Sequence, residues 1–187
     1  MVMRIRRAAL MVALTLLMAT SLAGVAWAAN VIRCAPRIVV PFCEGTGKND
    51  VMYGTNKADW IGGGQYGADT LYGRDGDDEL VGGVGPDTIR GGPGDDYITN
   101  GDNDYWFGED ENHGGRGNDS IVGNLMSEKH FGARGDDYLG DYKSIERPDT
   151  FRCGPGLDQV HYNKGIDKVA ADCEKLWAAG PRYVTPY

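Results

Sequence analysis

Acidic residues recur at a nearly fixed interval through the middle of this 187-residue chain, and most of the glycines lie between them. Residues 44–140 hold 24 of the 29 glycines and 20 of the 27 acidic residues, against seven basic residues, for a local charge of −13. A segment with so much like charge and so little apolar side chain cannot fold by ordinary burial. It is therefore either disordered or held together by cations.

The spacing of the acids favours the second alternative. Four segments are nine residues long and share one pattern of glycine, acid and apolar residue: 54–62 (GTNKADWIG), 73–81 (GRDGDDELV), 82–90 (GGVGPDTIR) and 91–99 (GGPGDDYIT). The same pattern recurs in residues 114–122 (GGRGNDSIV) and 132–140 (GARGDDYLG). Four copies are irregular: one extra residue is present in 44–53 and in 63–72, one residue is missing from 100–107, and the copy at 123–131 is degenerate. The sixth-place acids are Asp50, Asp59, Asp69, Asp78, Asp87, Asp96, Asp104, Asp119 and Asp137, with Glu128 in the degenerate copy. A repeat architecture is therefore predicted.

These segments resemble the RTX, or hemolysin-type, calcium-binding nonapeptide repeat GGxGxDxUx, in which U is a large apolar residue. The resemblance implies an all-β fold, a right-handed parallel β-roll (β-solenoid) with calcium ions between turns. It also implies that several Ca²⁺ ions are bound by the sixth-place aspartates and by carbonyls near glycines such as Gly83, Gly85, Gly92 and Gly94. On that scheme Asp59 pairs with Asp78, Asp69 with Asp87 and Asp78 with Asp96, while the fifth-place Asp77, Asp95 and Asp136 stay solvated.

Each repeat should end in a three-residue strand whose middle side chain points inward, because strand side chains alternate between faces. The residues expected in the core are Met52, Ile61, Leu71, Leu80, Ile89, Ile98, Trp106, Ile121 and Leu139. This core is narrow, and glycine loses much conformational freedom on folding. Calcium binding and folding are therefore expected to be one event.

The first 28 residues predict a secretory signal peptide, with Arg4, Arg6 and Arg7 before an apolar run and a small-residue cleavage site at its end. The alternative is an uncleaved membrane anchor, but the apolar run is short for a span. Removal of the leader leaves 16 basic and 27 acidic residues, a charge of −11, which disfavours nucleic acid as a partner. A secreted protein without a membrane span is expected.

Four cysteines, Cys34, Cys43, Cys153 and Cys173, flank the repeats. In an oxidising compartment four cysteines most simply form two disulfides. Three connectivities are possible, and proximity in sequence favours Cys34 with Cys43 and Cys153 with Cys173. The alternative is that the cysteines are free thiols or bind a metal. We expect an N-terminal cap over 29–43 and a C-terminal capping region over 141–187. In the latter, Asp149 and Asp158 lie in degenerate repeats, and residues 165–179 suggest a last strand and a short helix.

The sequence gives little support for catalysis. Its three histidines form no HExxH motif, no GxSxG elbow is present, and the GxGxxG at residues 62–67 lacks a preceding strand. The charged segment 108–113 (GEDENH), with Asp110 and His113, is expected to be a solvated bulge, an extra metal site being the alternative. Aromatic residues in outward places are Tyr53, Trp60, Tyr72, Tyr97, Tyr105, Phe107 and Tyr138.

Three functions follow from these features. The first is a secreted, non-catalytic calcium-binding protein with a structural or interaction role, similar to the small exported calcium-binding proteins of bacteria. The second is a calcium-dependent adhesin or polysaccharide-binding module, whose partner on a cell surface would contact the outward aromatic residues. A degradative enzyme or cytolysin fragment is the third and is less favoured.

Overall fold

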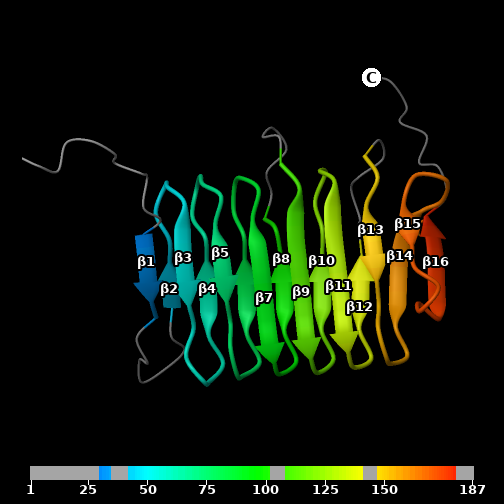
Figure 1. Ribbon diagram of the computed structural model, residues 1–187, viewed down its shortest axis with the longest axis horizontal. Coiled ribbons are helices and arrows are strands. Elements are labelled where there is room, and N and C mark those ends of the chain that lie inside the picture. Colours follow the sequence, from blue (N-terminus) through cyan, green and yellow to red (C-terminus); the bar gives the residue numbers. More distant parts are fainter. Residues whose placement is uncertain (1–29, 35–41, 102–107, 141–146, 180–187) are drawn as a thin grey trace, which may run out of the picture.

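The computed structural model describes residues 30–34, 42–101, 108–140 and 147–179, and all of its regular elements there are β-strands (Figure 1). The chain winds back and forth between two parallel sheets of eight strands each. Sheet A contains β1 (Asn30–Arg33), β3 (Asp50–Tyr53), β5 (Thr70–Tyr72), β7 (Thr88–Pro93), β9 (Asp110–Arg116), β11 (Glu128–Arg134), β13 (Thr150–Arg152) and β15 (Lys168–Val169). Sheet B contains β2 (Phe42–Glu44), β4 (Trp60–Gly62), β6 (Glu79–Val81), β8 (Tyr97–Thr99), β10 (Ser120–Val122), β12 (Tyr138–Gly140), β14 (Gln159–Asn163) and β16 (Lys175–Ala179). The predicted all-β parallel roll is confirmed.

The core consists of two columns of side chains, one from the middle of each strand in each sheet. Register aligns Met52, Leu71 and Ile89 in sheet A, and Ile61, Leu80, Ile98, Ile121 and Leu139 in sheet B. All eight are fully buried, as the alternation of strand side chains predicts. Phe151 and Val160 continue the two columns, so the degenerate repeats follow the same register. Trp106 lies outside the described residues.

Two polar side chains interrupt the sheet A column. Asn112 follows Ile89 in register, and His130 follows Asn112 before Phe151 restores an apolar residue. Both are fully buried. The segment 108–113 is therefore not the solvated bulge that its charge suggested, because β9 begins at Asp110 and directs alternate side chains inward.

The turns need glycine where successive coils approach each other. Gly85 and Gly94 have φ values of 139° and 141°, and a Cβ at either would overlap the carbonyl oxygen of the glycine one coil earlier. The second place of the repeat also takes positive φ, and two non-glycine residues adopt it there: Arg74 and Ala133, both with φ of 82°. These two positions carry backbone strain that their glycine counterparts avoid.

Both ends of the described roll are closed by disulfides. Cys34 pairs with Cys43, and Cys153 pairs with Cys173, which is the connectivity that proximity favoured. The short helix suggested near the C-terminus is wrong, because residues 175–179 form β16 and pair with β14. Among the described residues there is no helix long and apolar enough to cross a membrane.

Candidate metal centre

Acidic side chains form two buried ranks, one along each edge of the roll. The first edge consists of the turns that lead from sheet A to sheet B, at the bottom of Figure 1, and the second edge consists of the return turns. The first-edge rank contains Asp59, Asp78, Asp96, Asp119, Asp137 and Asp158; the second-edge rank contains Asp50, Asp69, Asp87, Asp110, Glu128 and Asp149. Every one of these side chains is at most 3% exposed, which is exceptional for carboxylates.

Backbone hydrogen bonds hold each rank in place. The Asp59 amide donates to Asp78 Oδ1 at 2.8 Å, and the Asp78 amide donates to Asp96 Oδ1 at 2.9 Å. The same bond recurs down the first edge to Asp158 and joins Asp50, Asp69, Asp87 and Asp110 on the second. The structure thus brings together the three aspartate pairs expected from the repeat, one coil apart.

The other carboxylate oxygen of most rank members is buried without a hydrogen-bond partner. These orphan oxygens are Oδ2 of Asp69, Asp78, Asp87, Asp96, Asp119, Asp137 and Asp158, and Oδ1 of Asp50. Leaving one buried acceptor unsatisfied costs about 1–3 kcal/mol, and more when it is charged. Unless it is protonated, a rank of such oxygens is expected to bind a cation.

Backbone carbonyls face the same space as the orphan oxygens. Beside the Cα of Gly73 lie both Asp78 Oδ2 and the carbonyl oxygen of Gly91, which belongs to the next coil. Asp96 Oδ2 and the carbonyl of Gly114 flank Gly91 in the same way. In the parts of the chain that the structure describes, no three His, Cys, Asp or Glu side chains converge on one point. A cation here would therefore take paired carboxylates together with carbonyl oxygens, a donor set that suits Ca²⁺.

Burial also makes these carboxyl groups hard to ionise without a cation. Desolvation raises the pKa of Asp78 and Asp96 to about 7 and that of Asp87 and Asp119 to about 8, although backbone amides oppose the shift. Neighbouring carboxylates raise these pKa values further. A divalent cation would reverse this effect by favouring the ionised form.

At one level of the second edge, protein groups satisfy the carboxylates instead. We call Asn100, Asn112, Glu128 and His130 the amide cluster. Asn100 Nδ2 donates to Glu128 Oε1 at 2.9 Å, and His130 Nε2 lies 3.2 Å from Glu128 Oε2. The Asn124 amide also donates to Glu128 Oε1. Asp110 and Glu128 have no orphan carboxylate oxygen, whereas the amide oxygens Asn100 Oδ1 and Asn112 Oδ1 are buried at this level without a hydrogen-bond partner.

Several candidate residues lie elsewhere than the sequence indicated. Asp104 lies outside the described residues, and Asp110 occupies the place in the rank next to Asp87. Asp110 was missed because the extra residues before it shift the register, although the alternation of Asp110 and Asn112 signals a strand. Asp77, Asp95 and Asp136 are exposed as expected, but they also accept backbone hydrogen bonds from the next coil.

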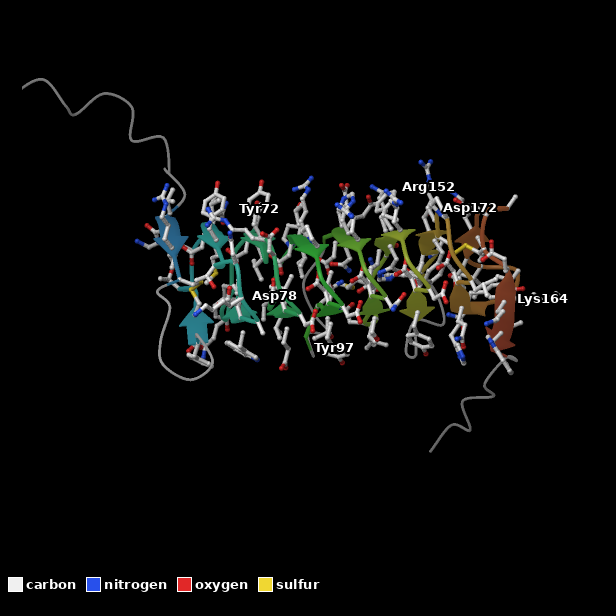
Figure 2. The ribbon with its side chains drawn as sticks, turned by 90° about the horizontal axis from the view of Figure 1, so that it is seen from below. Tyr72, Asp78, Tyr97, Arg152, Lys164 and Asp172 are labelled. Atoms are coloured by element: carbon white, nitrogen blue, oxygen red, sulfur yellow. A yellow bond between two sulfur atoms is a disulfide. The ribbon has the colours of Figure 1, made fainter. Side chains whose placement is uncertain are left out.

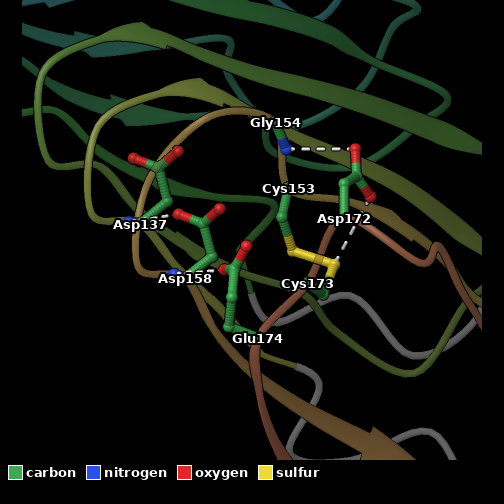
Figure 3. The surroundings of a disulfide bond; sticks show 7 residues. All are labelled: Asp137, Cys153, Gly154, Asp158, Asp172, Cys173 and Glu174. Atoms are coloured by element: carbon green, nitrogen blue, oxygen red, sulfur yellow. Dashed lines mark hydrogen bonds between the residues drawn. A yellow bond between two sulfur atoms is a disulfide. The ribbon is translucent and has the colours of Figure 1, made fainter.

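Gly83, Gly85 and Gly94 lie in turns that flank the ranks and Gly92 lies near the end of β7, with each Cα packed against a carbonyl of the preceding coil. At the C-terminal end, the Cys153–Cys173 disulfide lies near the last members of the first-edge rank (Figure 3). The carbonyl of Cys153 replaces that of a first-place glycine near Asp137 Oδ2, and Glu174, next to Cys173, accepts a hydrogen bond from the Asp158 amide at 3.0 Å. Residues adjoining this disulfide thus contact the end of the rank.

The profile of the RTX calcium-binding nonapeptide repeat matches the chain in four overlapping copies, at residues 44–80, 64–88, 72–107 and 107–125. No curated protein matches the chain. The matched region contains the Asp78, Asp87 and Asp96 turns, where sequence pattern and orphan oxygens coincide.

Proposed function

Because residues 44–125 consist of RTX calcium-binding nonapeptide repeats, we propose that this protein is a secreted, non-catalytic calcium-binding protein whose roll folds when calcium enters the two acid ranks. The observation that carries the proposal is the set of buried carboxylate oxygens without partners. Calcium would bind those oxygens and compensate the repulsion between carboxylates stacked one coil apart.

The two edges differ in how much calcium they can hold. On the first edge, orphan oxygens occur in five consecutive coils, from Asp78 to Asp158. On the second edge the orphan carboxylate oxygens occur at Asp50, Asp69 and Asp87 and cease at the amide cluster. We infer an uninterrupted array of ions along the first edge and a shorter one along the second.

Folding after export follows from the same chemistry. Extracellular calcium modules bind at about 10⁻⁴ to 10⁻³ M, so the repeats would remain loose at cytosolic calcium and order outside the cell. Two disulfides also suit an oxidising compartment. The leader over residues 1–28, which lies outside the described residues, is the proposed route of export.

The placement of the histidines supports a non-catalytic role. His130 is fully buried in the core, His113 pairs with Glu111 at 2.6 Å and stacks on Phe131, and His161 stacks on Trp177. Each has a structural environment that accounts for its presence.

Calcium titration tests the proposal. Chelated protein at pH 7.5 should give a coil-like far-ultraviolet circular dichroism spectrum, and millimolar calcium should produce β signal with several ions bound per chain by titration calorimetry. Magnesium is the matched control, because its small octahedral shell suits rigid carbonyl sites poorly. A spectrum that does not change across the calcium titration would sink the proposal.

A second candidate function is calcium-dependent attachment to a polysaccharide. One observation favours it: a row of aromatic and arginine side chains runs along the outer face of sheet A.

A further inference from the structure

The outer face of sheet A carries a continuous row of planar side chains. Register aligns, in order, Arg33, Tyr53, Tyr72, Arg90, His113, Phe131 and Arg152, and we call these seven residues the planar row. Figure 2 shows Tyr72 and Arg152 projecting from this face, with Tyr97 on the opposite face and Asp78 between the sheets.

Members of the planar row stack on one another along the axis of the roll. Tyr53 and Tyr72 have ring centroids 4.9 Å apart at an interplanar angle of 6°, and His113 and Phe131 are 4.5 Å apart at 6°. The guanidinium of Arg90 lies 5.7 Å from the Tyr72 ring, and that of Arg152 lies 5.8 Å from the Phe131 ring. The ring faces are therefore largely covered by neighbours, which leaves little ring face on which a sugar could stack.

The planar row exposes hydrogen-bond donors of its arginine side chains to solvent. Arg33, Arg90 and Arg152 are exposed, and each guanidinium carbon lies within 5.8 Å of the centroid of a neighbouring ring. A planar guanidinium presents paired N–H donors suited to a carboxylate or sulfate. The three arginines recur every third strand, which places them about 14 Å apart along a straight line.

The charge of this face is opposite to that of the rest of the protein. The planar row contains three arginines and no acid, whereas the chain as a whole has a net charge of −8. Sheet B has no arginine in either outward row: one row includes Trp60, Glu79 and Tyr97, and the other includes Gly62, Val81 and Thr99. Glu111, beside Arg90, is the acid nearest to the centre of the planar row, and it is already bonded to His113.

We propose that the planar row binds an acidic polysaccharide, a linear glycan that bears carboxylate or sulfate groups. This deepens the second candidate function and rests on the calcium-dependent fold proposed above. A linear polymer can follow the straight row and meet successive arginines. Beside the row lie the short side chains of Val51, Thr70 and Thr88, which leave room for the polymer and add hydroxyl groups.

Other polyanions fit less well. Nucleic acid carries about one charge per 1.7 Å, and the strongly acidic remainder of the protein would repel it. An anionic membrane would be repelled likewise. A glycan with sparser charges meets the three arginines without that penalty.

The test compares Arg90→Gln with Lys175→Gln, which removes the same charge from the exposed outer face of sheet B. Binding of hyaluronan oligosaccharides to the full chain in calcium is measured by titration calorimetry, with neutral dextran, single-stranded DNA and phosphatidylglycerol vesicles as comparison ligands. Arg90→Gln should weaken hyaluronan binding about fivefold, as expected for one exposed charged contact, and Lys175→Gln should change it little.

Equal effects of the two substitutions, no hyaluronan binding by the wild type, or binding of dextran, DNA or vesicles as strong as that of hyaluronan would each overturn the proposal. Circular dichroism in calcium on the same samples separates this failure from failure of calcium-dependent folding. A folded protein that does not bind the glycan contradicts the planar-row proposal alone.

Discussion

Asp96→Asn is expected to remove calcium from two successive levels of the first edge. Asp96 lies between Asp78 and Asp119 in the rank, and its Oδ2 atom is one of the orphan oxygens. Asparagine has the same shape and keeps the oxygen that accepts the Asp78 amide at 2.9 Å. The substitution therefore removes the charge and one ligand oxygen while leaving the backbone ladder intact.

The magnitude follows from linkage. One calcium ion at a hundredfold excess over its Kd stabilises the folded state by about 2.7 kcal/mol, so two lost levels should lower the free energy of unfolding by about 5 kcal/mol. Without calcium the effect should reverse. Burial raises the pKa of Asp96 to about 7, so the carboxylate destabilises the folded state at pH 8, a cost that a neutral amide avoids.

The assay is urea unfolding followed by circular dichroism at pH 8, with calcium and with chelator, alongside calorimetric stoichiometry. The matched control is Asp95→Asn in the same turn, where the side chain is exposed and asparagine retains the bond to the Asn118 amide. The control should change stability by less than about 0.5 kcal/mol. The reasoning is refuted if both variants lose equal stability in calcium, or if Asp96→Asn binds as many ions as the wild type.

Four further outcomes are expected. Chelated protein should gain β signal by circular dichroism as the pH falls from 8 towards 5. Burial raises the pKa values of the rank carboxyl groups, so the stability of the calcium-free protein is present at low pH and is lost as the pH rises through about 7. A circular dichroism signal that does not change with pH would contradict this. Asn100→Asp should lower the free energy of unfolding of the calcium-loaded protein by about 3 kcal/mol in urea, because it places a second carboxylate against Glu128. Ala133→Gly should raise the free energy of unfolding by up to about 1 kcal/mol, because glycine adopts the positive φ at this position without strain. Replacing Cys153 and Cys173 together by serine should cost about 3 kcal/mol for a loop of 20 residues, measured as the shift in urea midpoint against oxidised wild type.

The nine-residue period predicted most of the architecture because the repeat couples one inward side chain to one acid at a fixed offset. Ile89 and Asp87, for example, are both buried as that offset requires. The period failed beyond residue 100, where extra residues displace the register and Asp110 takes the next place in the rank. The amide cluster could not be foreseen, since Asn100 and Glu128 are 28 residues apart and meet only through the stacking of coils.

The C-terminal strand shows a different limit. Residues 170–179 are rich in Ala, Glu, Lys and Leu, which favour helix in isolation. In the fold, β16 pairs with β14 over five residues, with Val160 opposite Leu176, and this tertiary pairing overrides the local preference. The predicted caps thus include strands of the roll itself.

The two terminal disulfides have a mechanical consequence. Tension applied between the ends of the roll would enter at Cys34, pass directly through the sulfur bridge to Cys43, and leave residues 35–42 unloaded. At the other end the force would cross from Cys153 to Cys173 and bypass β14 and β15. The coils between Cys43 and Cys153, which hold most of the acid ranks, would carry the load, so the resistance of this protein to stretching should depend on calcium concentration.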